Sequence, residues 1–349
     1  MIDPIRDGAM HKIRKAGWVV GIVVMFLGCA FLEDAPIKPV IISAEVEDDS
    51  DDPAIWVHPD DPSQSLILGT DKGGELLAFD LSGKVVAKQE KLLRPNNVDV
   101  EYGVMLNGQR VDIAVVTDRD AEKIFIFRMP DLASLDGGEG IDVFEGEEES
   151  DVMGVGLYKR PDDGAVFVIL SRKSGSKSGY LWQYRVVDRG DRLGIEKVRA
   201  FGRWSGMAEI EAVVVDDELG FVYYSDEVFG IRKYLADPDA PNAESELMVF
   251  GTDGFVEDRE GVSIYTQPNG QGYILVSDQQ GNAFHIFQRS GDHAKVGVIT
   301  LSTQNSDGSD VTSVRLNAQF PDGLFVAMSN DRTFHFYDWR EIAKKIERQ

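Results

Sequence analysis

Short apolar runs separated by polar turns dominate the chain from residue 37 onward. The runs are about 4 to 8 residues long and rich in Val, Ile, Phe and Tyr, and clusters of Gly, Asp, Asn and Pro lie between them. Runs of this length bounded by turn residues are typical of β-strands. Only residues 339–347, near the C-terminal end, have a pattern that predicts a helix. The sequence therefore predicts an all-β protein.

One group of strands recurs along the chain. In each copy a second strand ends in a polar pair and is followed by a third strand with aromatic residues. The second strands begin near Leu66, Val111, Val166, Phe221, Tyr273 and Leu324, at intervals of 45, 55, 55, 52 and 51 residues. Each interval suits one four-stranded blade. Six such units predict a six-bladed β-propeller.

The last unit has too few strands to make a full blade. It ends at Tyr337 after three strands, and one strand between residues 37 and 46 precedes the first unit. We expect this N-terminal strand to complete the last blade, because closure removes open sheet edges. No linker separates the units, so residues 39–345 are predicted to form one propeller domain. A pair of β-sandwich domains is the structural alternative.

Polar residues gather where inner strands begin and second strands end. Neighbouring strands of a blade are antiparallel, so both positions lie at the same end of the ring. The inner strands open at 51–52, 96–99, 151, 209–211, 258–260 and 309–310, and the second strands close at 71–72, 118–119, 172–173, 226–227, 278–279 and 330–331. Turn chemistry alone places Asp and Asn at strand ends. It does not explain acids in every blade beside basic residues. We expect all twelve positions to ring one mouth, with about half of the side chains of each group facing the channel or its rim because side chains alternate along a strand.

Charge narrows the choice of ligand. The formal net charge is −24, from 36 Lys and Arg against 60 Asp and Glu. This charge disfavours nucleic acid and anionic lipid as partners. Carboxylates that meet at one mouth repel each other unless cations lie between them. We expect several Ca²⁺ ions there, because a hard cation accepts many oxygen ligands and leaves positive charge for a phosphate.

The N-terminal segment has the order of an export signal. Basic residues at positions 11–15 precede an apolar run, Ala16 to Leu32, that contains Leu27-Gly28-Cys29. We interpret residues 1–29 as a signal peptide with a candidate lipobox and residues 30–38 as a short linker. Lipidation of Cys29, plain cleavage and retention as a membrane anchor all stay open. Each predicts export, to the cell envelope as an outer-membrane or periplasmic lipoprotein or as a secreted protein.

Two motifs stand out at the beginnings of inner strands, Ser50-Asp51-Asp52-Pro53-Ala54-Ile55-Trp56 and Asn96-Asn97-Val98-Asp99-Val100. They resemble the signatures of the β-propeller phytases, alkaline calcium-dependent enzymes that remove phosphates from inositol phosphates. Further matches lie at 70–72, 118–119, 209–212, 216–220, 260–265, 307–312 and 323–327, so the likeness spans residues 44–345. The resemblance implies a phosphoric monoester hydrolase of the 3-phytase type, acting on phytate (myo-inositol hexakisphosphate) or related phosphorylated compounds.

The resemblance also implies roles for individual residues. In that family calcium ions hold the phosphate, a bridging water attacks phosphorus, and Lys and Arg bind the phosphate oxygens. The implied metal ligands are Asp51, Asp52, Glu211, Glu227, Asp258, Glu260, Gln279, Asp307 and Asp310. The implied catalytic set is Lys72, Arg119, Lys173, Glu211 and Glu260, of which the three basic residues bind phosphate. Metals lower the pKa of bound water, so no protein nucleophile is required.

Three positions depart from the family pattern. Glu101 stands where well-known members have Arg, Gly73 replaces one of two paired lysines, and Met153 replaces a tyrosine. Fewer cations weaken the binding of a heavily phosphorylated substrate more than that of a single phosphate, so the sequence predicts a phosphatase before it predicts a phytase.

Two other functions stay open. One is a non-catalytic surface propeller that binds phosphorylated ligands or partner proteins, and the other is a calcium-dependent lactonase-like hydrolase. An uncharged lactone would give Lys72 and Arg119 no purpose. A monomer is expected, with membrane contact only through the N-terminal lipid or signal anchor.

Overall fold

The computed structural model describes residues 35–349. The predicted signal peptide, the lipobox and Cys29 lie outside the described residues. Residues Pro36–Gln349 form one compact unit. Within the described part of the chain, no helix is long and apolar enough to cross a membrane.

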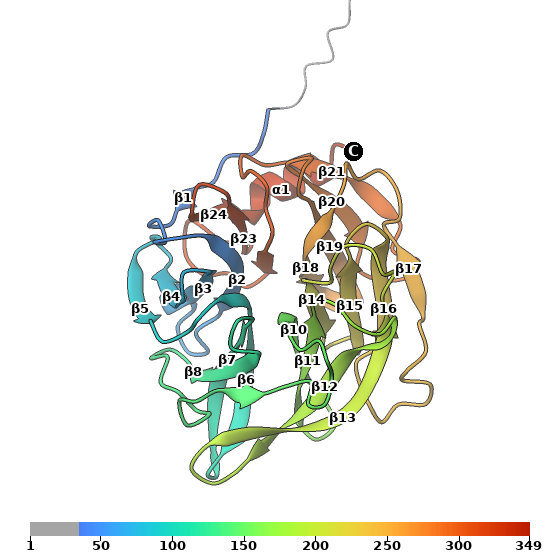
Figure 1. The fold of residues 1–349 in the computed structure, drawn as a ribbon. Coiled ribbons are helices and arrows are strands. Elements are labelled where there is room, and N and C mark those ends of the chain that lie inside the picture. The colour runs from blue at the N-terminus through green and yellow to red at the C-terminus, as the bar shows by residue number, and fades with distance from the viewer. Residues whose placement is uncertain (1–34) are drawn as a thin grey trace, which may run out of the picture. The chain divides into compact units, whose positions relative to one another are not determined.

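Six four-stranded antiparallel sheets make up this unit (Figure 1). Blade 1 contains β2 (Ser50–Trp56), β3 (Leu66–Asp71), β4 (Glu75–Asp80) and β5 (Val85–Gln89). Blade 2 contains β6 (Pro95–Leu106), β7 (Gln109–Asp118), β8 (Lys123–Arg128) and β9 (Ile141–Asp142). Blade 3 contains β10 (Val152–Lys159), β11 (Val166–Arg172), β12 (Ser178–Asp188) and β13 (Leu193–Arg203).

The second half of the ring repeats this order. Blade 4 contains β14 (Val213–Asp216), β15 (Phe221–Asp226), β16 (Gly230–Leu235) and β17 (Met248–Phe250). Blade 5 contains β18 (Arg259–Gln267), β19 (Gln271–Asp278), β20 (Ala283–Gln288) and β21 (Lys295–Thr300). Blade 6 contains β22 (Ser309–Thr312), β23 (Leu324–Ser329), β24 (Thr333–Asp338) and the N-terminal β1 (Ile41–Ile42). The predicted six-bladed propeller is confirmed.

The ring closes through the N-terminal strand. β1 pairs antiparallel with β24, and Ile41 faces Phe336 in the register. The contact between blades 6 and 1 is apolar, with the rings of Phe79 and Phe334 5.7 Å apart. Gly69 makes this contact possible, because a Cβ there would lie 2.3 Å from the Phe334 ring. The predicted closure is therefore a packed joint between the two ends of the chain.

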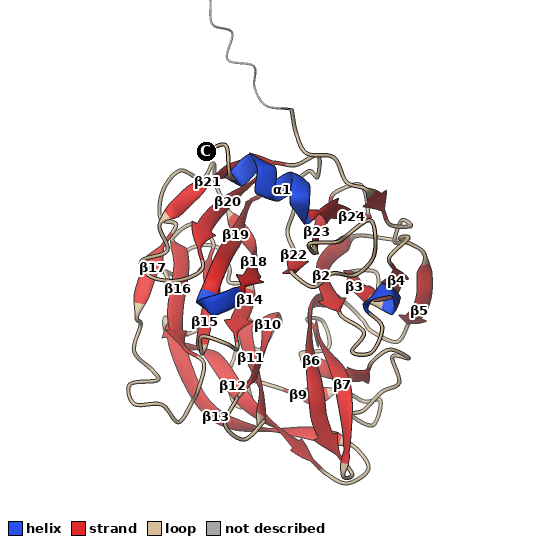
Figure 2. Ribbon diagram, turned by 180° about the vertical axis from the view of Figure 1, so that it is seen from behind, coloured by secondary structure: helices blue, strands red, loops and turns tan. Residues whose placement is uncertain are grey.

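The single α-helix among the described residues follows the last blade. It is α1 (Trp339–Ile346), and Asp338 caps it by accepting a hydrogen bond from the Arg340 amide. Two short 3₁₀ turns, Pro62–Gln64 and Pro268–Gly270, complete the helical elements described. The Trp339 ring stacks on Tyr265 of β18 at 3.6 Å, and the helix packs against the apolar core that blades 5 and 6 share (Figure 2).

Candidate active site

Four second strands end in a buried aspartate that fixes the loop before the inner strand. These residues are Asp71, Asp118, Asp226 and Asp278. Asp71 accepts hydrogen bonds from the amides of Glu47, Asp48 and Asp49, and Asp118 accepts from Leu93 and Arg94. Asp226 accepts from Ser205, and Asp278 from Val256. These four carboxylates accept hydrogen bonds from backbone amides, so in four of the six second-strand pairs predicted to ring the mouth the first member is structural.

The residue after each second strand occupies an equivalent place in every blade. Its amide donates to a loop carbonyl, with nitrogen–oxygen distances from 2.9 to 3.4 Å. We call these residues the outer ring: Lys72, Arg119, Lys173, Glu227, Gln279 and Asn330. The first five line one cavity of about 340 Å³. In blades 1 to 5, alternation along the strand therefore sends the first member of each predicted pair into the fold and the second to the mouth. In blade 6 the equivalent residue is Asn330, the first member of the predicted pair 330–331.

A second ring comes from the beginnings of the inner strands. In four blades the pairing register shifts there, and two residues are left out of the ladder. Such bulges redirect side chains. The residue two places before the first regular pair of the strand forms the inner ring, whose members are Asp51, Asn96, Met153, Glu211, Glu260 and Asp307. Four of these six side chains are carboxylates.

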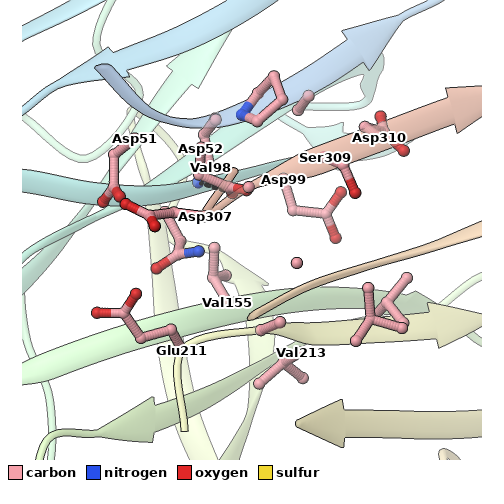
Figure 3. Close-up of a pocket in the computed structure, with 18 residues that line it drawn as sticks. Asp51, Asp52, Val98, Asp99, Val155, Glu211, Val213, Asp307, Ser309 and Asp310 are labelled. Carbon is pink, nitrogen blue, oxygen red and sulfur yellow. Dashed lines mark hydrogen bonds between the residues drawn. The ribbon is translucent and has the colours of Figure 1, made fainter. Parts of the chain in front are cut away.

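The two rings meet at one end of the central channel. Lys72 Nζ lies 2.9 Å from Asp51 Oδ1 and 3.7 Å from Asp307 Oδ2, and Lys173 Nζ lies 2.8 Å from Glu209 Oε1. The Gln279 amide donates to Asp307. Figure 3 shows the carboxyl groups of Asp51, Asp307 and Glu211 at the same end of the pocket. The basic members of the outer ring belong to blades 1 to 3, and its acidic member to blade 4.

Burial and mutual repulsion destabilise the charged forms of these carboxylates. Burial raises the pKa of Asp51 and of Glu260 well above the usual values, and neighbouring carboxylates raise both further. It also raises the pKa of Glu211 and Asp307, and that of Glu227 to about 8. A group of acids that resists ionisation in this way requires protons or bound cations.

Several buried oxygen atoms of the inner ring have no hydrogen-bond partner. They are Asp51 Oδ2, Asn96 Oδ1 and Glu260 Oε2. Buried polar atoms are rarely left unpaired, and all three are oxygens of the kind that calcium binds. The donor set therefore fits a hard divalent cation. As the side chains stand, no three Asp, Glu, His or Cys residues between positions 35 and 349 form a ready metal cage.

Comparison with known proteins decides the family. The phytase family model matches residues 30–344 of the chain. The chain belongs to the phytase family. Family membership makes it a phosphoric monoester hydrolase. A 3-phytase of Bacillus subtilis (strain 168) is similar to this phytase-family chain, with 31% identity over 327 residues, 87% of this chain and 82% of that protein.

Solved structures support the architecture of this phytase-family chain. A luciferin-regenerating enzyme superposes with a TM-score of 0.54 at 12% identity, covering 86% of this chain and 95% of the other. A calcium-binding protein, regucalcin from Agrobacterium tumefaciens strain C58, superposes with a TM-score of 0.52 at 11% identity, covering 86% and 94%. At such low identity these likenesses concern the fold alone.

Two predicted metal ligands of this phytase-family chain lie deeper in the channel. Asp310 Oδ2 accepts a hydrogen bond from the Ile55 amide at 2.7 Å, and Asp52 Oδ2 accepts from the Val98 amide at 3.1 Å. Each carboxylate thus ties its inner strand to that of the next blade. Burial raises the pKa of Asp52 to about 8 and that of Asp310 to about 6.

Asp258, also a predicted ligand, lies beside the two rings. Its carboxylate accepts a hydrogen bond from the Gln280 amide group at 2.8 Å. Its negative charge contributes to the raised pKa of Glu227 and of Glu260. The remaining predicted ligands belong to the inner or the outer ring.

The three departures from the family pattern have different surroundings. A Cβ on residue 73 would lie 2.7 Å from the Cβ of Asp48, so Gly73 allows a close approach that a lysine would disturb. Met153 is a fully buried member of the inner ring. Glu101 lines a different cavity, of about 420 Å³, together with Tyr102 and Asp217. The expectation that Glu101 costs the mouth a basic contact is therefore wrong.

Sequence reasoning missed Asp49 and Arg94, whereas Glu209 belongs to the range 209–211 that was predicted to ring the mouth. Glu209 lines the cavity and pairs with Lys173, and Asp49 lies 3.7 Å from Lys72 Nζ. The carbonyl oxygen of Arg94 accepts the amide of Arg119 at 3.0 Å. All three occupy the same loop position, so the repeat itself was the signal that could have found them.

Proposed function

We propose that this chain hydrolyses phytate and related phosphomonoesters in a reaction that depends on calcium ions bound at the mouth. The observation that carries the proposal is the single cavity in which Lys72, Arg119 and Lys173 face Glu211, Glu227 and Glu260. Cations alone would bind a phosphate and carboxylates alone would repel it. Both together suit a phosphate held over metal ions. The similarity to a 3-phytase supports phytate as the substrate.

Several residues would hold the ions. Oxygen donors come from the inner-ring carboxylates Asp51, Glu211, Glu260 and Asp307, from Glu227 and Gln279 of the outer ring, and from the adjoining Asp258. Asp52 and Asp310 extend the acidic surface into the channel. Bound calcium supplies positive charge that polarises the phosphoryl group and lowers the pKa of a coordinated water.

The basic residues bind and orient the substrate. Within residues 35–349, the Arg119 side chain has no ion-pair partner, whereas Lys72 and Lys173 both have one. A free guanidinium offers two parallel N–H donors to a phosphate. Arg119 is therefore the side chain best prepared to fix one phosphate group, with the two lysines on either side of it along the ring.

Three further features belong to this proposal. Several calcium ions are bound, since the donors are spread over both rings and the channel. The protein is exported through residues 1–29 to the cell envelope or the medium, with any membrane contact limited to that segment. It acts as a monomer on a small phosphorylated substrate. The binding propeller and the lactonase-like hydrolase gain no support from the family match.

Phosphate release tests the proposal. The full chain is assayed on phytate and on an aryl phosphate, first with calcium and then with an excess of chelator. Arg119→Gln should lower kcat/KM on both substrates by about tenfold or more. Arg128→Gln is the matched control, because Arg128 is exposed and pairs with Asp131 away from the mouth. If phosphate is released from neither substrate, the proposed hydrolase activity is wrong. If activity is undiminished in excess chelator, the proposed calcium dependence is wrong.

A further inference from the structure

The Lys72 side chain lies among the carboxylates of the mouth. Its Nζ is 2.9 Å from Asp51 and 3.7 Å from both Asp49 and Asp307. The side chain is only 14% exposed, and Asp51 is 2% exposed. A cation already occupies the place where inner-ring carboxylates from blades 1 and 6 converge.

The three basic residues of the outer ring differ in how far they are neutralised. Lys72 contacts three carboxylates and Lys173 contacts one, and within residues 35–349 Arg119 contacts none. An ammonium surrounded by three carboxylates offers little net charge to a phosphate. Lys72 can bind a phosphate only after another cation has replaced its ammonium group at those carboxylates.

The ammonium also leaves the acidic group incompletely satisfied. It contacts Oδ1 of Asp51, while Oδ2 of the same carboxylate is buried and has no partner. Glu260 Oε2 is likewise buried and has no hydrogen-bond partner. One monovalent group on a side-chain tether cannot reach all of these oxygens, whereas a divalent ion accepts six to eight oxygen ligands.

We propose that Lys72 is an exchangeable internal cation. Its ammonium holds Asp51 and Asp307 together in the metal-free protein, a divalent cation takes over those carboxylates, and the released side chain turns to the phosphate. This inference rests on the proposed calcium dependence. It makes metal binding a precondition of phosphate binding by Lys72, because the same side chain cannot serve both partners.

Calcium affinity of the substrate-free protein gives the first test. In Lys72→Met no ammonium has to leave, so calcium should bind about tenfold or more tightly than to the unaltered chain in isothermal titration. Lys173→Met is the matched control, since it removes one mouth cation that contacts neither Asp51 nor Asp307, and its affinity should change by less than about threefold. Equal or weaker binding by Lys72→Met overturns the exchange.

The position of the ammonium gives the second test. A crystal structure with calcium and without phosphate should show Lys72 Nζ beyond hydrogen-bond distance of Asp51 and Asp307. A structure in which the contact with Asp51 persists beside bound calcium overturns the exchange, even if Lys72→Met does not fold without metal. Both readouts are independent of activity. Failure of the proposed function would appear instead as phosphate release that needs no calcium.

Discussion

The carbonyl oxygen of Glu211 lies 1.9 Å from the point where a Cβ on residue 154 would stand. Gly154 in blade 3 thus lets the beginning of the blade 4 inner strand come close enough to present Glu211 to the mouth. Gly154→Ala should force these strands apart and lower the free energy of unfolding by about 1 to 3 kcal/mol, measured by urea denaturation. Gly164→Asn is a suitable control, because no atom lies within 4 Å of a Cβ at that position and Asn tolerates its positive φ. Unchanged stability of Gly154→Ala would contradict the tight contact.

The inner-ring carboxylates should cost stability without metal and add stability with it. Glu260→Gln keeps the shape of the side chain and removes a charge that repels Glu211, Glu227 and Asp307. We expect the metal-free protein to gain about 1 kcal/mol, while the rise in Tm on adding calcium becomes smaller. Calorimetry with and without calcium measures both. If neither value changes, Glu260 is an ordinary turn acid and not part of a cation site.

A second pair of acids, Glu101 and Asp217, predicts that stability falls as pH rises from acidic to neutral values. Glu101 and Asp217 share a hydrogen bond, and burial followed by the charge of Glu101 raises the pKa of Asp217 to about 8. The folded chain therefore holds a proton that the unfolded chain has lost, and stability falls as pH rises from about 4 to 8. Glu101→Gln should flatten this slope in urea denaturation series. Glu139→Gln, at an exposed site, should keep it, and an unchanged slope in Glu101→Gln would refute the shared proton.

A buried pair of a lysine and a histidine predicts a loss of stability at acidic pH. Lys233 Nζ lies 3.0 Å from His293 Nε2, and the Nδ1–H of the ring donates to the Gln288 carbonyl. Burial and the nearby ammonium lower the pKa of His293. As pH falls, His293 is therefore protonated at a higher pH in the unfolded chain than in the folded chain. Stability is lost as pH falls below about 6.5. His293→Gln should lose less stability than the unaltered chain between pH 7 and 5. His58→Gln serves as the control at a partly exposed site, and equal slopes for both variants would count against the pair.

Arg94 should favour substrates with several phosphates. Its loop position is occupied by Asp49, Asp151, Glu209, Asp258 or Gln304 in the other blades, and only in blade 2 do arginines hold both this loop position and the outer-ring position. Arg94→Gln should raise KM for phytate by about tenfold and leave the kinetics on an aryl phosphate unchanged. Arg110→Gln, which removes an exposed arginine bound to the Gly103 carbonyl, should change neither. An equal effect of Arg94→Gln on both substrates would contradict a selective role.

The sequence predicted the architecture because each blade carries its own pattern of apolar and turn residues. The starts of the second strands, the terminal helix and the completion of blade 6 by the N-terminal strand all follow from that pattern. The gathering of Lys72, Arg119, Lys173, Glu227 and Gln279 in one cavity also followed, since antiparallel pairing brings those strand ends together.

Side-chain direction was the part that sequence could not supply. Asp71 and Lys72 are adjacent, yet one binds loop amides and the other faces the mouth, and only the strand register separates them. At the inner strands, bulges of two residues break the simple alternation, so Asp51 joins the mouth while Asp52 ties two blades together. Glu101 lies only four residues after Asn97 but at another cavity, because an extended strand carries it along the channel.

The pairing of β1 with β24 joins the first described strand to the last. During synthesis, residues 41–42 emerge long before residues 333–338 exist, so the earliest strand waits through the production of five blades before it finds its partner. The ring therefore cannot be sealed one blade at a time. Shortening the chain at either end would open the same seam, and fragments that lack one edge should associate with a separately supplied strand from the other.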